Sequence, residues 1–171
     1  MNNRYFSTKK LCFVALFMAM NIALSSFGIP VPGGHLYLND IVICFAALVF
    51  DPVSAFIVGG VGAFLGDLFF YPTPMFVSLV THGLQAVAIS LIVGKKDHTP
   101  RFWLVIVALS VGVAIMVTGY SLGRAFIYST PEYAVIKLPY QFAQAIVGAV
   151  VACLLMYKSP IKKFIYSIPK K

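Results

Sequence analysis

Four polar side chains lie inside long apolar segments of the sequence, where a polar group is costly to place. His82 and Gln85 are three residues apart, so a helix would put them on one face. Gln144 and Arg124 lie in two later apolar segments. A charged group near the middle of a bilayer costs about 2.5–3.5 kcal/mol on insertion scales, and ionisable groups there usually face a cavity or the bundle interior. These four residues are therefore candidates for ligand binding, with hydrogen bonds between helices as the alternative role.

The chemistry of these side chains indicates binding rather than catalysis. Amides, an imidazole and tyrosine rings suit a small, flat, polar heterocycle, because the amides can pair with ring nitrogens and hydroxyls while the rings stack. The candidate binding residues are His82, Gln85, Arg124, Tyr140, Gln141, Gln144, Asn39, Asp67 and Tyr37. We find no paired carboxylates around a reactive centre, no recognisable Ser/His/Asp set and no metal-binding motif. We therefore expect no enzyme activity, no metal and no cofactor.

The composition requires a membrane around these residues. The 171 residues, enough for one domain spanning 1–171, are 60% hydrophobic and 11% charged, against roughly 25% charged in an ordinary soluble domain. A soluble protein of this length could not bury so much apolar surface, so the bilayer must act as solvent. The sequence also lacks a P-loop, so the chain alone cannot use ATP to drive transport.

Six apolar segments predict an all-α integral membrane protein with six transmembrane helices. They are separated by charges, glycines and prolines, and the second is short for a span of about 20 residues. The predicted spans are 8–27, 38–50, 52–70, 75–94, 102–128 and 136–157. Thr130-Pro131 is expected to end the fifth span, so that the sequence around 128–141 forms a loop.

The basic residues predict the orientation of these helices. An even number of spans places both termini on one side, and eleven of the thirteen Lys and Arg residues then fall on that side. The positive-inside rule assigns this side, with both termini, to the cytoplasm. The formal net charge of +8 is explained by topology, and we expect no nucleic-acid partner.

With this orientation the candidate binding residues gather toward the outer side. Tyr37 and Asn39 lie in the loop 28–40, and Asp67 ends the third span. Tyrosines favour membrane interfaces in any protein, so a belt of interfacial side chains is the simpler explanation for each tyrosine alone.

Two stretches contain small residues at helical spacing. Ala15, Ala19 and Ala23 recur every four residues in the first span, and such stripes allow another helix to approach closely. The stretch FDPVSAFIVGGVGAFLGDLF, which includes most of the third span, carries four glycines and has an aspartate, Asp67, near its end. We expect these glycines to bring a neighbouring backbone or a ligand close to the helix.

With these features the sequence resembles the S components, the substrate-binding membrane subunits of energy-coupling factor (ECF) vitamin transporters. The layout of the whole chain is similar, and the specific likeness lies in two stretches: the AxxxA stripe and LVFDPVSAFIVGGVGAFLGDLFFYPTP. The resemblance implies six helices, a location in the bacterial plasma membrane as a multi-pass protein, and an outward-facing pocket for a vitamin. It also implies partners: a transmembrane coupling (T) subunit that docks on the alanine stripe, and two ATPase (A) subunits.

The substrate remains open among several vitamins. Neutral donors and acceptors together with aromatic rings favour a pyrimidine or pyridine such as hydroxymethylpyrimidine or pyridoxine. Pantothenate is the alternative because Arg124 could pair with its carboxylate, and riboflavin is a further one. Outside this family the alternatives are a stand-alone secondary transporter, for which the sequence lacks a convincing internal repeat, and a structural membrane protein.

Overall fold

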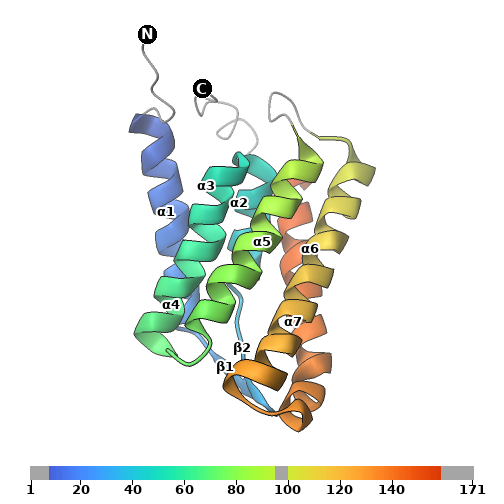
Figure 1. Ribbon diagram of the computed structural model, residues 1–171. Helices are drawn as coiled ribbons and strands as arrows, with labels where there is room; N and C mark the ends of the chain where they lie inside the picture. The colour runs from blue at the N-terminus through green and yellow to red at the C-terminus, as the bar shows by residue number, and fades with distance from the viewer. Residues whose placement is uncertain (1–7, 95–99, 159–171) are drawn as a thin grey trace.

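The computed structural model is a bundle of helices closed at one end by a small β-hairpin (Figure 1). It describes residues 8–94 and 100–158. In chain order the elements are α1 (Thr8–Ser25), β1 (Ile29–Val31), β2 (Gly34–Leu36), α2 (Asp40–Val49), α3 (Pro52–Phe56), the π-helical turn η1 (Ile57–Val61), α4 (Gly62–Phe70), α5 (Met75–Val93), α6 (Phe102–Gly123), the π-helical turn η2 (Arg124–Tyr128) and α7 (Pro131–Lys158).

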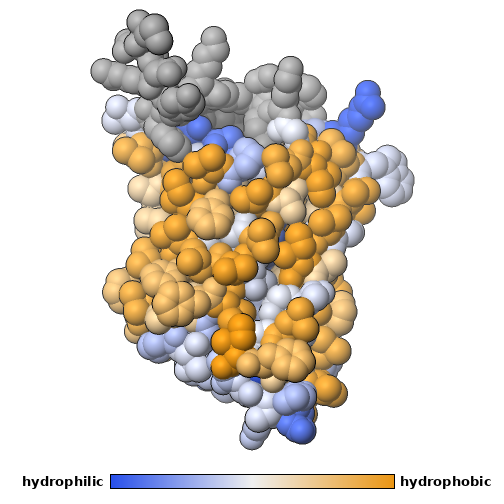
Figure 2. All heavy atoms as spheres, viewed as in Figure 1, coloured by the Kyte–Doolittle hydropathy of each residue, from blue (hydrophilic) through white to orange (hydrophobic). Residues whose placement is uncertain are grey.

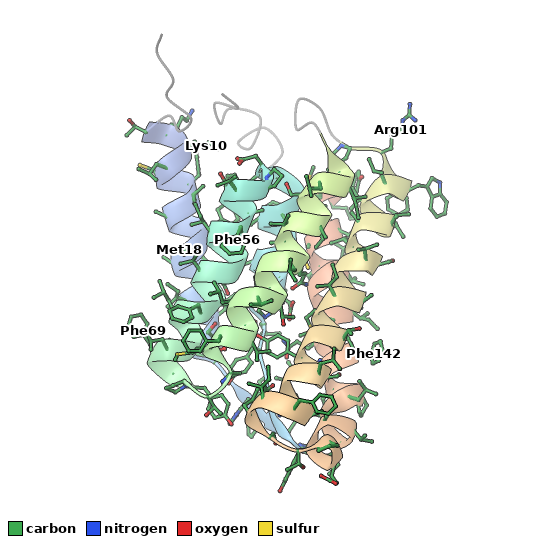
Figure 3. The ribbon with its side chains drawn as sticks, in the orientation of Figure 1. Lys10, Met18, Phe56, Phe69, Arg101 and Phe142 are labelled. Carbon is green, nitrogen blue, oxygen red and sulfur yellow. The ribbon has the colours of Figure 1, made fainter. Side chains whose placement is uncertain are left out.

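The start of α1 and the end of α7 lie at the same end of the bundle, opposite the hairpin (Figure 1). Lys10 and Arg101, two of the basic residues used to predict the orientation, also lie at that end (Figure 3). Others used in that prediction fall outside the described residues: Arg4, Lys95, Lys96, Lys162, Lys163, Lys170 and Lys171. The cytoplasmic assignment of this end stays a prediction.

Within residues 8–94 and 100–158, five helical segments are long and apolar enough to cross a membrane: Thr8–Ser25, Pro52–Phe70, Met75–Val93, Phe102–Tyr128 and Pro131–Lys158. Their flanks expose apolar side chains over most of the surface between the two ends (Figure 2). Phe69 and Phe142, for example, are 65% and 44% exposed and point outward (Figure 3). Such a surface fits a lipid environment, where apolar side chains need no cover.

The predicted span 38–50 is the exception, because α2 has only ten residues. At 1.5 Å per residue it extends about 15 Å, half of a hydrocarbon core of about 30 Å. Every residue from Val42 to Phe50 is buried, and α2 packs against α5 and α7. A helix that is apolar on all sides belongs in the interior of a bundle, which explains why this segment is hydrophobic without being long.

The glycines of the third span bring three helices into close contact, as expected. A Cβ placed on Gly59 or Gly60 would lie 3.0 Å from the carbonyl oxygen of His82 and 2.9 Å from that of Leu79, both in α5. On the other face, a Cβ on Gly62 or on Gly66 would collide with side chains of α1. The segment therefore packs between α1 and α5 at distances that only glycine allows.

The same segment contains the π-helical turn η1, which interrupts the regular backbone ladder. Asn21 of α1 is fully buried, and its Nδ2 donates a hydrogen bond of 2.7 Å to the carbonyl oxygen of Val58. Such turns leave a carbonyl without its usual partner, so the amide of Asn21 satisfies it and joins α1 to η1.

Two segments expected to be loops are partly regular. In 28–40, β1 and β2 pair antiparallel, with Val31 opposite Gly34. Pro32 and Gly33, whose φ is +81°, occupy the turn positions that favour proline and a positive φ in a type II turn. In 128–141, the prediction that Thr130-Pro131 is followed by a loop is wrong: α7 begins at Pro131, since proline suits the first helical position.

Candidate functional site

A polar cavity lies beneath the hairpin, enclosed by α4, α5, α6, η2 and α7. Its volume is ≈ 50 Å³, which is room for a few water molecules. It is lined by Gly34, His35, Tyr37, Asn39, Asp67, Tyr71, Pro74, His82, Met116, Tyr120, Arg124, Tyr128, Lys137, Gln141 and Gln144. Gly34 and His35 of the hairpin line the cavity, which therefore lies at the hairpin end of the bundle. This end is opposite the start of α1 and the end of α7 (Figure 1).

Most of the candidate binding residues meet at this cavity although they come from five separate parts of the chain. The ones that line it are Tyr37, Asn39, Asp67, His82, Arg124, Gln141 and Gln144. Gln85 lies behind the wall, where it contacts His82. Tyr140 is half-buried on α7 and is not part of the lining.

The inner wall of the cavity is a network of buried side chains around Asp40. Gln85 donates from Nε2 to Asp40 Oδ1 over 3.2 Å, and Gln144 donates from Nε2 to Asp40 Oδ2 over 2.7 Å. His82 Nδ1 lies 2.7 Å from Gln85 Oε1. Gln144 Oε1 accepts a 3.0 Å bond from the backbone N–H of Tyr37. The network therefore joins α2, α5 and α7 to Tyr37, the residue that directly follows β2.

A second carboxylate, Asp67, is held on the side formed by α4. Ser78 of α5 donates a short hydrogen bond to Asp67 Oδ2, and its hydroxyl lies 2.5 Å from the hydroxyl of Tyr120. The Tyr120 ring meets the His82 ring edge to face, with centroids 5.2 Å apart. These contacts place the carboxylate, a phenol and an imidazole around the same space.

Two cations hold the hairpin over the cavity. Arg124 donates from Nη1 to the carbonyl oxygen of Gly33, and Lys137 donates from Nζ to that of His35, each over 2.5 Å. Neither cation has a carboxylate within ion-pair distance among residues 8–94 and 100–158. The outer part of the cavity is thus positively charged, whereas Asp67 lines it on the α4 side and Asp40 lies behind its inner wall.

Tyr37 lies in this covering segment, outside the spanning helices. Burial, reinforced by the nearby charge of Asp67, raises its pKa to about 12, because both disfavour the phenolate. At neutral pH Tyr37 therefore presents a hydroxyl that can donate a hydrogen bond.

Three lining residues carry a buried polar atom that has no hydrogen-bond partner in the described part of the chain: Asn39 Oδ1, Arg124 Nε and Tyr128 Oη. A buried polar atom without a partner costs about 1–3 kcal/mol, so such atoms are normally paired with protein or water. Three of them around one cavity indicate that a polar ligand or water completes the site. In the described residues no cluster of His, Cys, Asp or Glu is placed to bind a metal ion.

Sequence reasoning missed several residues of the site. From the sequence, Asp40 is placed at the end of the loop 28–40, and Tyr120 and Lys137 are not among the candidate binding residues. Asp40 directly precedes a fully apolar segment, and an acidic residue in the first turn of a buried helix is a signal that could have found it. Nothing in the local sequence distinguishes Tyr120 from an interfacial tyrosine.

Residues 5–162 match the protein family described as ECF-type riboflavin transporter, S component. The thiamine precursor transporter HmpT of Lactococcus lactis subsp. cremoris is 33% identical over 152 residues, which cover 86% of this chain and 85% of HmpT. A Pyrococcus woesei protein, described as an uncharacterized protein in a gap 3′ region, is 28% identical over 141 residues, covering 81% of this chain and 93% of that protein.

Among solved structures, the crystal structure of FolT bound with folic acid has a similar fold. The TM-score is 0.62 over 93% of this chain and 98% of FolT, with 15% sequence identity. At this identity the likeness concerns the arrangement of the helices alone.

Proposed function

The chain belongs to the family of ECF-type riboflavin transporter S components, and from this premise we propose that it captures a water-soluble vitamin or vitamin precursor in the cavity beneath the hairpin. It is a multi-pass membrane protein of a vitamin transport family. The observation that supports the site is the convergence of polar side chains, three with unpaired buried atoms, on one cavity.

The proposed substrate is a pyrimidine or pyridine of the hydroxymethylpyrimidine or pyridoxine type. The buried amides of Gln141 and Gln144, the imidazole of His82 and the phenols of Tyr37 and Tyr120 match the hydroxyls and ring nitrogens of such a molecule. The 33% identity to a thiamine precursor transporter supports the same class.

Pantothenate is the second candidate, and one observation favours it. Arg124 and Lys137 line the cavity and form hydrogen bonds to carbonyl groups rather than ion pairs within the described chain. A ligand carboxylate could take the place of these carbonyls and form charge-assisted bonds. Riboflavin, which the family description names, is the third candidate.

Any of these ligands requires the cavity to enlarge. Small-molecule pockets usually measure about 300–1,000 Å³, and this one is ≈ 50 Å³. The side of the cavity that can move is the hairpin with Tyr37, since Arg124, Lys137 and Gln144 hold this segment by one hydrogen bond each.

We propose that the hairpin faces the outside of the bacterial plasma membrane and that the start of α1 and the end of α7 face the cytoplasm.

In this proposal the chain is not an enzyme. A transmembrane coupling subunit and two ATPase subunits would supply the energy and complete the importer. Ala15, Ala19 and Ala23 are exposed along one stripe of α1, which makes this stripe the proposed docking surface for the coupling subunit.

The experiment that tests the substrate is identification of bound molecules after purification from cells grown in rich medium, by mass spectrometry. Calorimetric titration of the ligand-free protein with hydroxymethylpyrimidine, pyridoxine, pantothenate and riboflavin would follow. Saturable binding of one pyrimidine or pyridine, with weak or no binding of the other two vitamins, is the expected result. Tight binding of pantothenate or riboflavin instead would replace the proposed substrate, and binding of none of the four would contradict the choice of ligand class.

A further inference from the structure

Asp40 is fully buried at the first turn of α2, in a position built to accommodate it. The contact with α7 occurs at Gly148, where a Cβ would lie 2.5 Å from the Cβ of Asp40. No Lys or Arg pairs with Asp40 in the described residues, and the nearest titratable nitrogen is His82 Nδ1 at 3.8 Å. A buried carboxylate is costly unless it is well hydrogen-bonded. The two amides that donate to Asp40 therefore offset the cost of burying it.

The carboxylate determines how those two amides are oriented. A carboxylate only accepts hydrogen bonds, so Gln85 and Gln144 must both turn their NH₂ groups toward it. Their carbonyl oxygens then point the other way. Gln144 Oε1 accepts a hydrogen bond from the backbone N–H of Tyr37, which can only donate. The bonds from Tyr37 to Gln144 and from Gln144 to Asp40 therefore form one branch of the network, in which each donor faces an acceptor.

On the other branch, the orientation of Gln85 determines the tautomer of His82. Gln85 Oε1 is an acceptor, so His82 Nδ1, 2.7 Å away, must carry the proton. In a neutral imidazole the second nitrogen, Nε2, is then an acceptor. Among the described residues His82 makes its one side-chain hydrogen bond through Nδ1, and the side chain lines the cavity. Nε2 is therefore available to a ligand.

We propose that Asp40 is the positioning residue of the site, because through Gln85 it fixes His82 as the Nδ1–H tautomer. Nε2 of His82 then presents a hydrogen-bond acceptor to the cavity. The cavity therefore selects ligands that offer an N–H or O–H donor to Nε2. The statement about ligands rests on the proposed function, whereas the statement about the tautomer does not. Asp40 acts through other residues and needs no contact with the ligand.

Nitrogen NMR of protein labelled in its histidines tests the tautomer without any ligand. The signal of His82 is assigned by its loss in His82→Gln. We expect wild type to show the Nδ1–H tautomer at neutral pH, and Asp40→Asn to lose this preference because an asparagine can either donate to or accept from Gln85. Asp51→Asn, at the opposite end of the bundle, is the matched control and should leave His82 unchanged.

A second variant keeps the test decisive if Asp40→Asn does not fold. Gln85→Leu leaves the carboxylate and Gln144 in place but removes the acceptor at 2.7 Å from Nδ1. The remaining oxygen, Asp40 Oδ1, is 3.8 Å from Nδ1, beyond hydrogen-bond distance, so the tautomer preference should again be lost. An Nε2–H tautomer in wild type, or a single Nδ1–H tautomer in the folded variants, would overturn the proposal.

The ligand part is tested with hydroxymethylpyrimidine and an analogue whose amino and hydroxyl hydrogens are replaced by methyl groups. Wild type should bind the unmodified compound at least about tenfold more tightly, as expected when a buried acceptor loses its donor, and Asp40→Asn should discriminate less. Equal discrimination by the variant would overturn the selective role of Asp40. If neither compound binds wild type, the proposed substrate fails while the tautomer result stands.

Discussion

At the scale of single residues, the cavity owes its properties to side chains that contact hydrogen-bonding partners on other helices. Gln144 connects the carboxylate of Asp40 to the backbone of Tyr37, and so couples the inner wall to the hairpin. Arg124 and Lys137 hold the same hairpin through its carbonyl groups. A change in one of these side chains therefore alters both the shape of the site and its cover.

Replacing Gln144 with leucine should weaken ligand binding without unfolding the protein. The substitution removes one donor from Asp40 and the acceptor for Tyr37, and we expect at least about tenfold lower affinity, consistent with leaving a buried polar group unpaired. Calorimetric titration with hydroxymethylpyrimidine, the proposed type of substrate, measures this change. Phe142→Leu, an outward-facing change on α7, is the control, and a Gln144→Leu protein of unchanged affinity would contradict the proposed site.

Tyr37 should make the protein sensitive to alkaline pH. Its pKa is raised from 10.0 to about 12 in the folded state, so the folded state holds the proton more tightly than the unfolded state. The associated stability is fully present below pH 10 and is lost as the pH rises toward about 12. Melting temperatures should therefore fall less steeply above pH 10 in Tyr37→Phe than in wild type. Parallel curves for the two proteins would show that Tyr37 is not buried as described.

At the scale of elements, the glycine-rich segment from Pro52 to Phe70 sets the spacing of the bundle. It packs against α1 on one face and α5 on the other, and it carries Asp67 at its end toward the cavity. Because α5 carries His82 and Gln85, the distance between the segment and α5 also fixes the width of the site.

Gly60→Ala should destabilise the protein more than Gly62→Ala. A Cβ on Gly60 would lie 2.9 Å from a backbone carbonyl oxygen and 3.0 Å from the Cα of Gly83, and backbone atoms cannot move away locally. At Gly62 the closest atom is Nδ2 of Asn21, a side-chain atom that can move by lengthening its hydrogen bond to the carbonyl oxygen of Val58, without any displacement of a backbone. Overpacking of this kind typically costs about 1–3 kcal/mol. Thermal unfolding of the two purified variants gives the order, and equal or reversed losses would contradict the packing described.

At the scale of the whole molecule, the two ends of the bundle have different roles in the proposed transport. The hairpin end contains the binding site, and the opposite end contains the starts of α1 and α3, joined by the 2.7 Å ion pair between Lys10 and Asp51. Hydrogen bonds from Lys10 and Ser54 outweigh burial and lower the pKa of Asp51, so the ion pair persists at neutral pH. The exposed alanine stripe runs between these two ends along α1.

Bulky residues in the alanine stripe should prevent assembly while leaving substrate binding intact. Leucine at Ala15 and Ala19 would hold a partner helix away from α1, so co-purification with the coupling and ATPase subunits, and vitamin uptake, should be lost. Affinity of the isolated protein should stay within about twofold, since the stripe is remote from the cavity residues. The matched control is leucine at Ala114 and Ala143, which are exposed on α6 and α7. Normal assembly of the stripe variant would exclude this surface as the docking site.

Much of the fold follows from composition and periodicity. Five long apolar segments became helices of spanning length, because a chain in lipid must satisfy its backbone hydrogen bonds internally. The family resemblance was confirmed by the family match. One local expectation failed for a local reason: 128–141 is not a loop, because α7 starts at Pro131, and proline suits the first helical position. The second apolar segment is short, as expected, and lies buried in the bundle.

The sequence by itself determined which residue types are costly in an apolar chain, and these include seven of the cavity-lining side chains. Only the tertiary structure decided which of them meet, because residues 37, 67, 82, 124 and 144 converge through packing between helices rather than through spacing along one helix. It also revealed Asp40, whose importance depends on two amides that are 45 and 104 residues away in sequence. Hydrogen-bond direction is a property of such contacts between distant segments, and no local pattern encodes it.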